Sequence, residues 1–244
     1  MSLPHIVNVY GLMLAPNVCN QELREVMRFS DFSVAHVITH AGDSSQLHEH
    51  HIMKEMYYIA SGSGVLTVGE QAFSVDSGAY VSIPPNTPHR LHNSSNKDIE
   101  YLVLATPPFQ TKDVDVILDT GEERIPQPFK PKWRAFEALD GATVYEVDSA
   151  EERRAQGFGV AIGFLPPLRA ATRHYHNISH EIYYVASGKG KVHLGDKLFD
   201  VTAGSVIYVP VPVVHGLENI SECEDLRVLC ISSPPFQDGD FIKA

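Results

Sequence analysis

The sequence predicts an all-β protein that consists of two similar domains in tandem, and two observations support this prediction. The first is an internal repeat: three histidines and a glutamate at positions 48, 50, 89 and 55 return at positions 174, 176, 215 and 181, each 126 residues later. The second is a succession of short β-rich runs separated by glycine and proline, which is typical of sandwiches and barrels. A period this long indicates a duplicated domain, because solenoid units repeat at about 20–50 residues.

The repeat extends well beyond these four positions. Residues 55–64 match residues 181–190 at seven of ten positions. The segment Pro-Pro-Phe-Gln at 107–110 returns at 234–237, an offset of 127, so one residue is inserted between Asn219 and Pro234. The repeat predicts one domain at residues 1–126 and another at 127–244, each long enough to bury its own core. The proline-rich stretch 120–132 is expected to contain the linker.

The predicted elements follow in the same order in both halves. Two hairpins turn at Gly69 and Gly195, and their strands are residues 65–68 with 72–75 and residues 191–194 with 198–201. Each hairpin is followed by a strand that stops at a proline, since proline cannot continue a hydrogen-bonded ladder; these strands are residues 80–83 and 206–209. Residues 99–104 and 226–231 are expected to form the last strand of each half. Residues 21–28 and 150–155 show a helical pattern.

Composition and charge exclude several classes of function. The formal net charge of −11 and the pI near 5.6 argue against nucleic-acid binding, which requires a cationic face. No apolar run approaches the roughly 20 residues of a membrane span, and the first residues lack the pattern of a signal peptide. The three cysteines have no spacing pattern typical of a disulfide framework, which favours the cytoplasm as the location.

The repeated histidines and glutamate predict a metal site in each half. Side chains alternate along a strand, so His48 and His50 should face the interior together, joined there by Glu55 and His89 from neighbouring strands. Three imidazoles and one carboxylate suit a transition metal better than magnesium or calcium. The second half predicts the same site from the later set, which is His174, His176, Glu181 and His215.

We therefore expect up to two divalent transition-metal ions per chain. Iron and manganese are expected first, while nickel, cobalt, copper and zinc are compatible with the same ligands. Four protein ligands on an ion that accepts five or six leave positions open for substrate, which favours catalysis over a structural role.

Two tyrosines and a cysteine lie close to these sites in the sequence. Tyr57 and Tyr183 come two residues after the glutamates Glu55 and Glu181, so each should share the inward face of its glutamate. We assign the two glutamates and the two tyrosines as candidate catalytic residues; the alternative is that the tyrosines only pack inside the barrel. Cys230 aligns with Leu104 at the 126-residue offset and is predicted to be a core thiol.

The spacing of these residues resembles the two sequence motifs of the cupin superfamily. The first motif reads Gly42-x5-His48-x-His50-x4-Glu55-x6-Gly62, and the second reads Gly78-x5-Pro84 followed by His89-x3-Asn93. The second half repeats both, from His174 to Gly188 and from Gly204 to Asn219, with Leu168 in place of the opening glycine. In the first half, Asn86 and Thr87 stand where the second motif usually has a turn glycine.

The resemblance implies two tandem double-stranded β-helix barrels of the jelly-roll type, with few short helices. It implies a metal-dependent enzyme that acts on a small organic substrate, and a dioxygenase-type oxidoreductase, such as the quercetinase-like bicupins, is the function expected first. A redox-neutral isomerase, decarboxylase or lyase is the alternative. A non-catalytic binding protein ranks third, and the sequence leaves a homodimer open.

Overall fold

The chain folds into two compact β units. The computed structural model describes residues 5–119, 121, 124–131, 133–237 and 239–244. One unit, here called the first barrel, comprises residues 12–131, and the other, the second barrel, comprises residues 5–11 with 133–244. The two units are therefore not the two contiguous halves of the chain. The division at residue 126 remains our proposal for the boundary between the duplicated segments.

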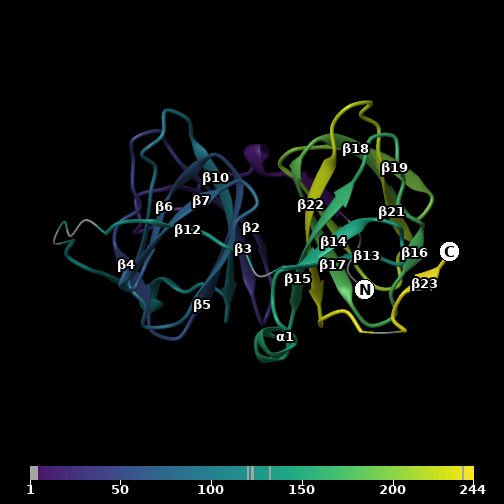
Figure 1. The fold of residues 1–244 in the computed structure, drawn as a ribbon. Helices are drawn as coiled ribbons and strands as arrows, with labels where there is room; N and C mark the ends of the chain where they lie inside the picture. Colours follow the sequence, from purple (N-terminus) through teal and green to yellow (C-terminus); the bar gives the residue numbers. More distant parts are fainter. Residues whose placement is uncertain (1–4, 120, 122–123, 132, 238) are drawn as a thin grey trace. The chain divides into compact units, whose positions relative to one another are not determined.

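The first barrel consists of two sheets (Figure 1). In order across the first sheet, the strands are β2 (Glu22–Arg28), β3 (Ser33–Thr39), β10 (Ile99–Thr106), β5 (Lys54–Ser61) and β8 (Tyr80–Ile83). Across the other sheet they are β11 (Val114–Val116), β4 (His48–His50), β9 (His89–His92), β6 (Ser63–Val68), β7 (Gln71–Asp76) and β12 (Gln127–Pro128), and a 3-10 turn spans η2 (Thr111–Asp113). Strand β12 belongs to the expected linker, whose residues 120, 122, 123 and 132 lie outside the described residues.

The second barrel repeats this topology (Figure 1). Its first sheet contains β1 (His5–Asn8), β20 (Ser205–Val209), β17 (His180–Ser187), β22 (Leu226–Ser233), β15 (Gly159–Leu165), β14 (Thr143–Glu146) and β13 (Arg134–Glu137). Its other sheet contains β19 (Lys197–Thr202), β18 (Lys189–Leu194), β21 (His215–Asn219), β16 (His174–Tyr175) and β23 (Ile242–Lys243), and the helical segments are η1 (Val9–Gly11) and α1 (Ala150–Gln156). The predicted pair of double-sheet jelly rolls is confirmed.

The strand at the start of the chain belongs to the second barrel. Strand β1 pairs antiparallel with β20, in a register that runs from His5 opposite Tyr208 to Asn8 opposite Ser205. The 126-residue repeat does not predict this pairing, because the strand that corresponds to β20 in the first barrel, β8, is the last strand of its sheet.

Each barrel has its own apolar core between its two sheets. In the first barrel the core includes Leu66, Ile83 and Leu91, and in the second it includes Val192 and Ile207, all of them almost completely buried. These residues come from strands of both sheets, and the side chains that alternate with them face the other way. Burial of these strand faces is the main source of stability for each barrel.

Of the two predicted helices, one is confirmed and one is wrong. Helix α1 begins at a capping box made by Ser149 and Glu152 and ends at Gly157, which adopts the left-handed conformation. Residues 22–28 instead form strand β2, which pairs with β3 through a bulge between Glu25 and Met27. Tertiary pairing overrides a local helical pattern here. No helix within the described residues is long and apolar enough to cross a membrane.

One turn of the second barrel contains a strained residue where the first barrel has glycine. The nitrogen of Gly42 donates to the carbonyl of Asn93, and the nitrogen of Leu168 donates to the carbonyl of Ser221, two residues after Asn219, the counterpart of Asn93. Both residues adopt positive φ, +82° for Gly42 and +57° for Leu168, and the Leu168 side chain is exposed. A side chain on a left-handed residue is unfavourable, so this turn costs the second barrel stability.

Replacing Leu168 by glycine should therefore stabilise the protein. We expect the free energy of unfolding to rise by about 1 kcal/mol, because relief of the left-handed strain exceeds the entropy that glycine adds to the unfolded chain. Chemical denaturation of the parent and of Leu168→Gly measures this change. The matched variant Gly42→Leu in the first barrel should lose a similar amount, and an unchanged or lower stability of Leu168→Gly would contradict the prediction.

Candidate metal centres

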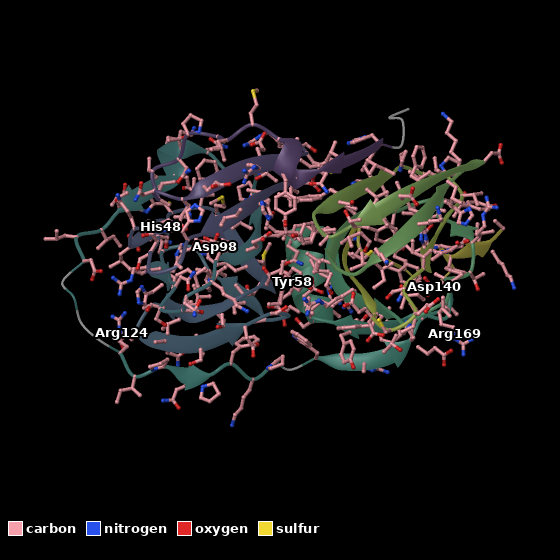
Figure 2. All side chains as sticks on the ribbon, turned by 90° about the horizontal axis from the view of Figure 1, so that it is seen from above. His48, Tyr58, Asp98, Arg124, Asp140 and Arg169 are labelled. Atoms are coloured by element: carbon pink, nitrogen blue, oxygen red, sulfur yellow. The ribbon has the colours of Figure 1, made fainter. Side chains whose placement is uncertain are left out.

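The fold brings each predicted set of four ligands together. His48, His50, Glu55 and His89 are buried in the first barrel, and each offers a ligand atom within 4.8 Å of the others. The same criterion holds in the second barrel for His174, His176, Glu181 and His215. His48 lies directly opposite His89 across strands β4 and β9, and His174 lies opposite His215 across β16 and β21. Figure 2 shows the side chains of both barrels and labels His48 in the first.

Backbone carbonyls orient most of these imidazole rings. The Nδ1 atoms of His48 and His89 lie 2.8 and 2.9 Å from the carbonyls of the residues two positions earlier in the chain. His174 and His215 make the same contacts at 2.8 and 2.9 Å. A carbonyl only accepts, so Nδ1 of each ring carries the proton and Nε2 presents its lone pair, as a metal ligand requires.

Two other ring nitrogens provide a test of whether the sites suit a metal. Among the described residues, Nε2 of His50 and Nε2 of His176 are buried and make no hydrogen bond of good geometry, although a carboxylate oxygen lies 3.3 and 3.5 Å away, respectively. A buried nitrogen without a partner is costly, and a metal ion in the quartet would satisfy it. The donor set also fits, because three imidazoles and one carboxylate favour a divalent transition metal. Both quartets thus have the composition and geometry of divalent metal sites.

The protonation states of His48, His174 and the two glutamates match this role. Burial lowers the pKa of His48 to about 4 and also lowers the pKa of His174, so both rings stay neutral near pH 7. Burial acts to raise the pKa of Glu55 and of Glu181, but the neighbouring histidines outweigh it and hold both pKa values below the ordinary range. Neutral imidazoles and an ionised carboxylate are the forms that bind metals.

The two glutamates make similar contacts with their histidines. In the first barrel, His89 Nε2 lies 3.0 Å and His50 Nε2 lies 3.3 Å from oxygens of Glu55. In the second, His215 Nε2 lies 2.8 Å and His176 Nε2 lies 3.5 Å from Oε2 of Glu181. The duplicated sites therefore share a common geometry.

Each of the two tyrosines lines the same cavity as ligands of its quartet. Tyr57 lines a cavity of about 360 Å³ in the first barrel, and its ring lies 5.9 Å from that of His89. Tyr183 lines a cavity of about 440 Å³ in the second barrel, and its hydroxyl donates to Oε2 of Glu181 over 2.5 Å. Burial, together with the charge of the adjacent glutamate, raises the pKa of both phenols well above the ordinary value. Both tyrosines are therefore protonated at physiological pH.

Cys230 packs against the core of the second barrel, as predicted, but its alignment with Leu104 is wrong. Cys230 lines the cavity of the second barrel, and its Sγ lies 3.5 Å from Oε1 of Glu181. The one-residue insertion explains the error. The side chain of Asn93 donates to the carbonyl four residues later, whereas that of Asn219 donates five residues later, so the insertion lies between Asn219 and Glu224. Cys230 thus corresponds to inward-facing Val103, and their cross-strand partners are Tyr183 and Tyr57.

Two buried aspartates near the quartets are missing from the sequence prediction. Carboxylate oxygens of Asp113 accept from the backbone nitrogens of Ile52 and Met53, in the loop that follows His50. Asp240 accepts in the same way from Asn177, Ile178 and Ser179, and its backbone carbonyl lies 3.0 Å from Nδ1 of His176. A sequence signal existed, since both aspartates lie three residues after the repeated Pro-Pro-Phe-Gln.

Removing the Asp240 carboxylate should weaken metal binding at the second site. The loop that follows His176 would lose three hydrogen bonds, and we expect the affinity for Mn(II) to fall by roughly 10–100-fold, as for other outer-shell partners of metal ligands. Competition with a metal indicator measures this affinity in Asp240→Ala. Asp113→Ala should weaken only the first site, and equal Mn(II) affinity in parent and Asp240→Ala would refute the assigned role.

Comparison with known proteins identifies the family. A model of the cupin domain matches residues 35–105 and again residues 161–232. An uncharacterized protein of Methanocaldococcus jannaschii, MJ1618, is 34% identical over 85 residues, which are 35% of this chain and 68% of the relative. Oxalate decarboxylase OxdC of Bacillus subtilis is 29% identical over 143 residues, which are 56% of this chain but only 36% of that enzyme.

Solved structures support the same fold. The oxalate decarboxylase of Lactobacillus farciminis, solved as a formate complex, superimposes with a TM-score of 0.71 at 17% identity and covers 100% of this chain and 88% of that chain. This similarity concerns the fold alone. With two matched cupin domains and a metal-ligand quartet in each, the chain belongs to the cupin family as a bicupin.

Proposed function

We propose that this bicupin is a metal-dependent enzyme that catalyses redox-neutral cleavage of a small carboxylate substrate, with decarboxylation as the reaction. The observation that carries the proposal is the protonated phenol of Tyr183, which donates to Glu181 inside a largely apolar cavity. Sequence similarity to an oxalate decarboxylase over 143 residues supports the same reaction type.

Decarboxylation requires a bound carboxylate and a proton source. A divalent ion held by the quartet would supply Lewis-acid stabilisation of a substrate oxygen. Loss of carbon dioxide breaks a carbon–carbon bond and leaves an electron pair on the substrate carbon, which must accept a proton. Tyr183 is placed to donate that proton, and its hydrogen bond to Glu181 orients the hydroxyl. The cavity walls are largely apolar, and the phenol would regain its proton from solvent after product release.

The dioxygenase expected first from the sequence is not confirmed. The ligand quartets suit either reaction, whereas the similar enzymes named above are decarboxylases. The decarboxylase alternative is therefore the better supported of the two, and a small molecule remains the proposed substrate.

Reaction under strict exclusion of oxygen tests this proposal. Protein loaded separately with Mn(II), Fe(II) and Zn(II) is incubated with a panel of keto acids, hydroxy acids and aryl carboxylic acids. We expect metal-dependent release of carbon dioxide without oxygen uptake, and none from a variant in which His48, His89, His174 and His215 are all replaced by alanine. Substrate-dependent oxygen consumption with Fe(II) or Mn(II), and no conversion under anaerobiosis, would overturn the proposal in favour of the dioxygenase.

A further inference from the structure

The walls of the two cavities differ at one cross-strand pair. In the first barrel, Val37 on β3 lies opposite Tyr101 on β10, and both line the cavity. The corresponding pair in the second barrel is Gly163 on β15 and Val228 on β22, which also line their cavity. An isopropyl group and a phenol are thus replaced by a hydrogen atom and an isopropyl group at the same place in the wall.

This exchange opens the second cavity beside the metal quartet. In the first barrel, the ring of Tyr101 lies 5.1 Å from that of Tyr57, and its hydroxyl accepts from Thr39 over 3.5 Å, so the phenol fills the space next to the site. The second cavity is larger, about 440 Å³ against about 360 Å³. A methyl group built on Gly163 would meet nothing closer than the carbonyl of Val228 at 3.9 Å, so crowding by the backbone does not require glycine here.

The charges around the second cavity limit what the additional space accepts. Apart from the ligand histidines, Arg153 is the one cationic side chain among the described residues that line it. Arg153 is already engaged, since its Nη1 lies 3.2 Å from Glu146 and donates to the carbonyl of Asp148 over 3.0 Å. Asp140, labelled in Figure 2, adds negative charge to the lining. A second carboxylate on the substrate would therefore be desolvated without a cationic partner, which is costly.

The remaining walls are apolar. Val144 lies directly opposite Gly163 across β14 and β15, and the cavity lining also includes Leu217 and Phe236. Apolar surface of this kind favours an apolar ligand group through the hydrophobic effect, and the cavity volume lies in the range of small-molecule sites.

We propose that the second barrel takes a monocarboxylate that carries an apolar arm of about phenyl size, and that Gly163 and Val228 determine this specificity. The inference rests on the proposed function in one respect, namely that the carboxylate head binds at the quartet of His174, His176, Glu181 and His215. The first barrel, with Val37 and Tyr101 in place, accepts only a shorter ligand.

Calorimetric binding to the full-length, Mn(II)-loaded protein tests this specificity with three probes: 3-phenylpropanoate, acetate, and adipate, a dicarboxylate of similar reach. We expect one 3-phenylpropanoate per chain, bound about tenfold or more tightly than adipate. Gly163→Val should weaken 3-phenylpropanoate by about tenfold or more while acetate binding stays unchanged, because the added isopropyl group occupies only the space of the arm. Gly163→Ala, which has room for its methyl group, should show a smaller loss of affinity for 3-phenylpropanoate. This variant keeps the test valid if Gly163→Val fails to fold.

The control variant Val65→Ala, on β6 of the first barrel and outside the lining of both cavities, should leave this single tight binding event unchanged. Equal affinity of parent and Gly163→Val for 3-phenylpropanoate, tighter binding of adipate, or no binding of 3-phenylpropanoate at millimolar concentration would each overturn the inference. No turnover is required in these measurements. A protein that shows the expected binding pattern but releases no carbon dioxide from any acid would therefore retain the inference and lose the proposed reaction.

Discussion

Glu181→Gln should reduce the metal content of the saturated protein from two ions per chain to one and abolish turnover by the second barrel. Glutamine preserves the volume of the side chain but removes the anionic ligand that three histidines surround. The loss of activity should exceed the roughly 10–100-fold that removal of an outer-shell partner costs. Elemental analysis after saturation with Mn(II) and desalting, followed by rate measurements, checks both expectations.

The equivalent change in the first barrel, Glu55→Gln, serves as the matched control. It should also leave one ion per chain, and the rate that remains shows which barrel turns over substrate. Both variants should still melt cooperatively, because apolar strand faces rather than the ion hold each barrel together. Global unfolding of either variant would make the ion a structural one, and two ions retained in Glu181→Gln would refute the ligand assignment.

Tyr183→Phe should lower the turnover number by roughly 10²–10⁴-fold, the usual contribution of a positioned general acid. The substitution removes only the hydroxyl that donates to Glu181 and leaves the ring packed next to His215. Metal content and thermal stability should therefore stay close to those of the parent. Steady-state kinetics on the metal-loaded protein, with separate values of kcat and KM, measures the effect.

Tyr57→Phe in the first barrel provides the comparison. If the second barrel alone is active, the turnover number of Tyr57→Phe should equal that of the parent. An unchanged turnover number for Tyr183→Phe would show that Tyr183 is a packing residue, which is the alternative that the sequence leaves open. A rise in KM with kcat unchanged would assign the hydroxyl to substrate binding instead of proton transfer.

The sequence predicts the quartets well because their spacing encodes the strand geometry. His48 and His50 share a face by alternation, and the repeat of all four positions makes a chance pattern improbable. The hairpin turns at Gly69 and Gly195 are confirmed for a similar reason, since both residues adopt positive φ. Local chemistry determines these features, so a local pattern is sufficient to predict them.

The features that the sequence does not predict depend on non-local contacts. Residues 22–28 show a helical pattern, yet pairing with β3 makes them a strand. The inward orientation of Cys230 depends on where one inserted residue lies, and a shift of one position in a strand reverses the direction of every side chain. The roles of Asp113 and Asp240 depend on loops about 60 residues earlier in the chain.

The pairing of β1 with β20 has a consequence for biosynthesis. Residues 5–8 leave the ribosome about 200 residues before their partners at 205–208, which is roughly 10–40 s of translation. During that interval β1 has no native edge to join, and all the residues of the first barrel are made before the interval ends. The pairing also matters when the second barrel is produced as an isolated fragment. A fragment that starts at residue 133 lacks β1 and would expose the edge of β20 to pairing with other chains.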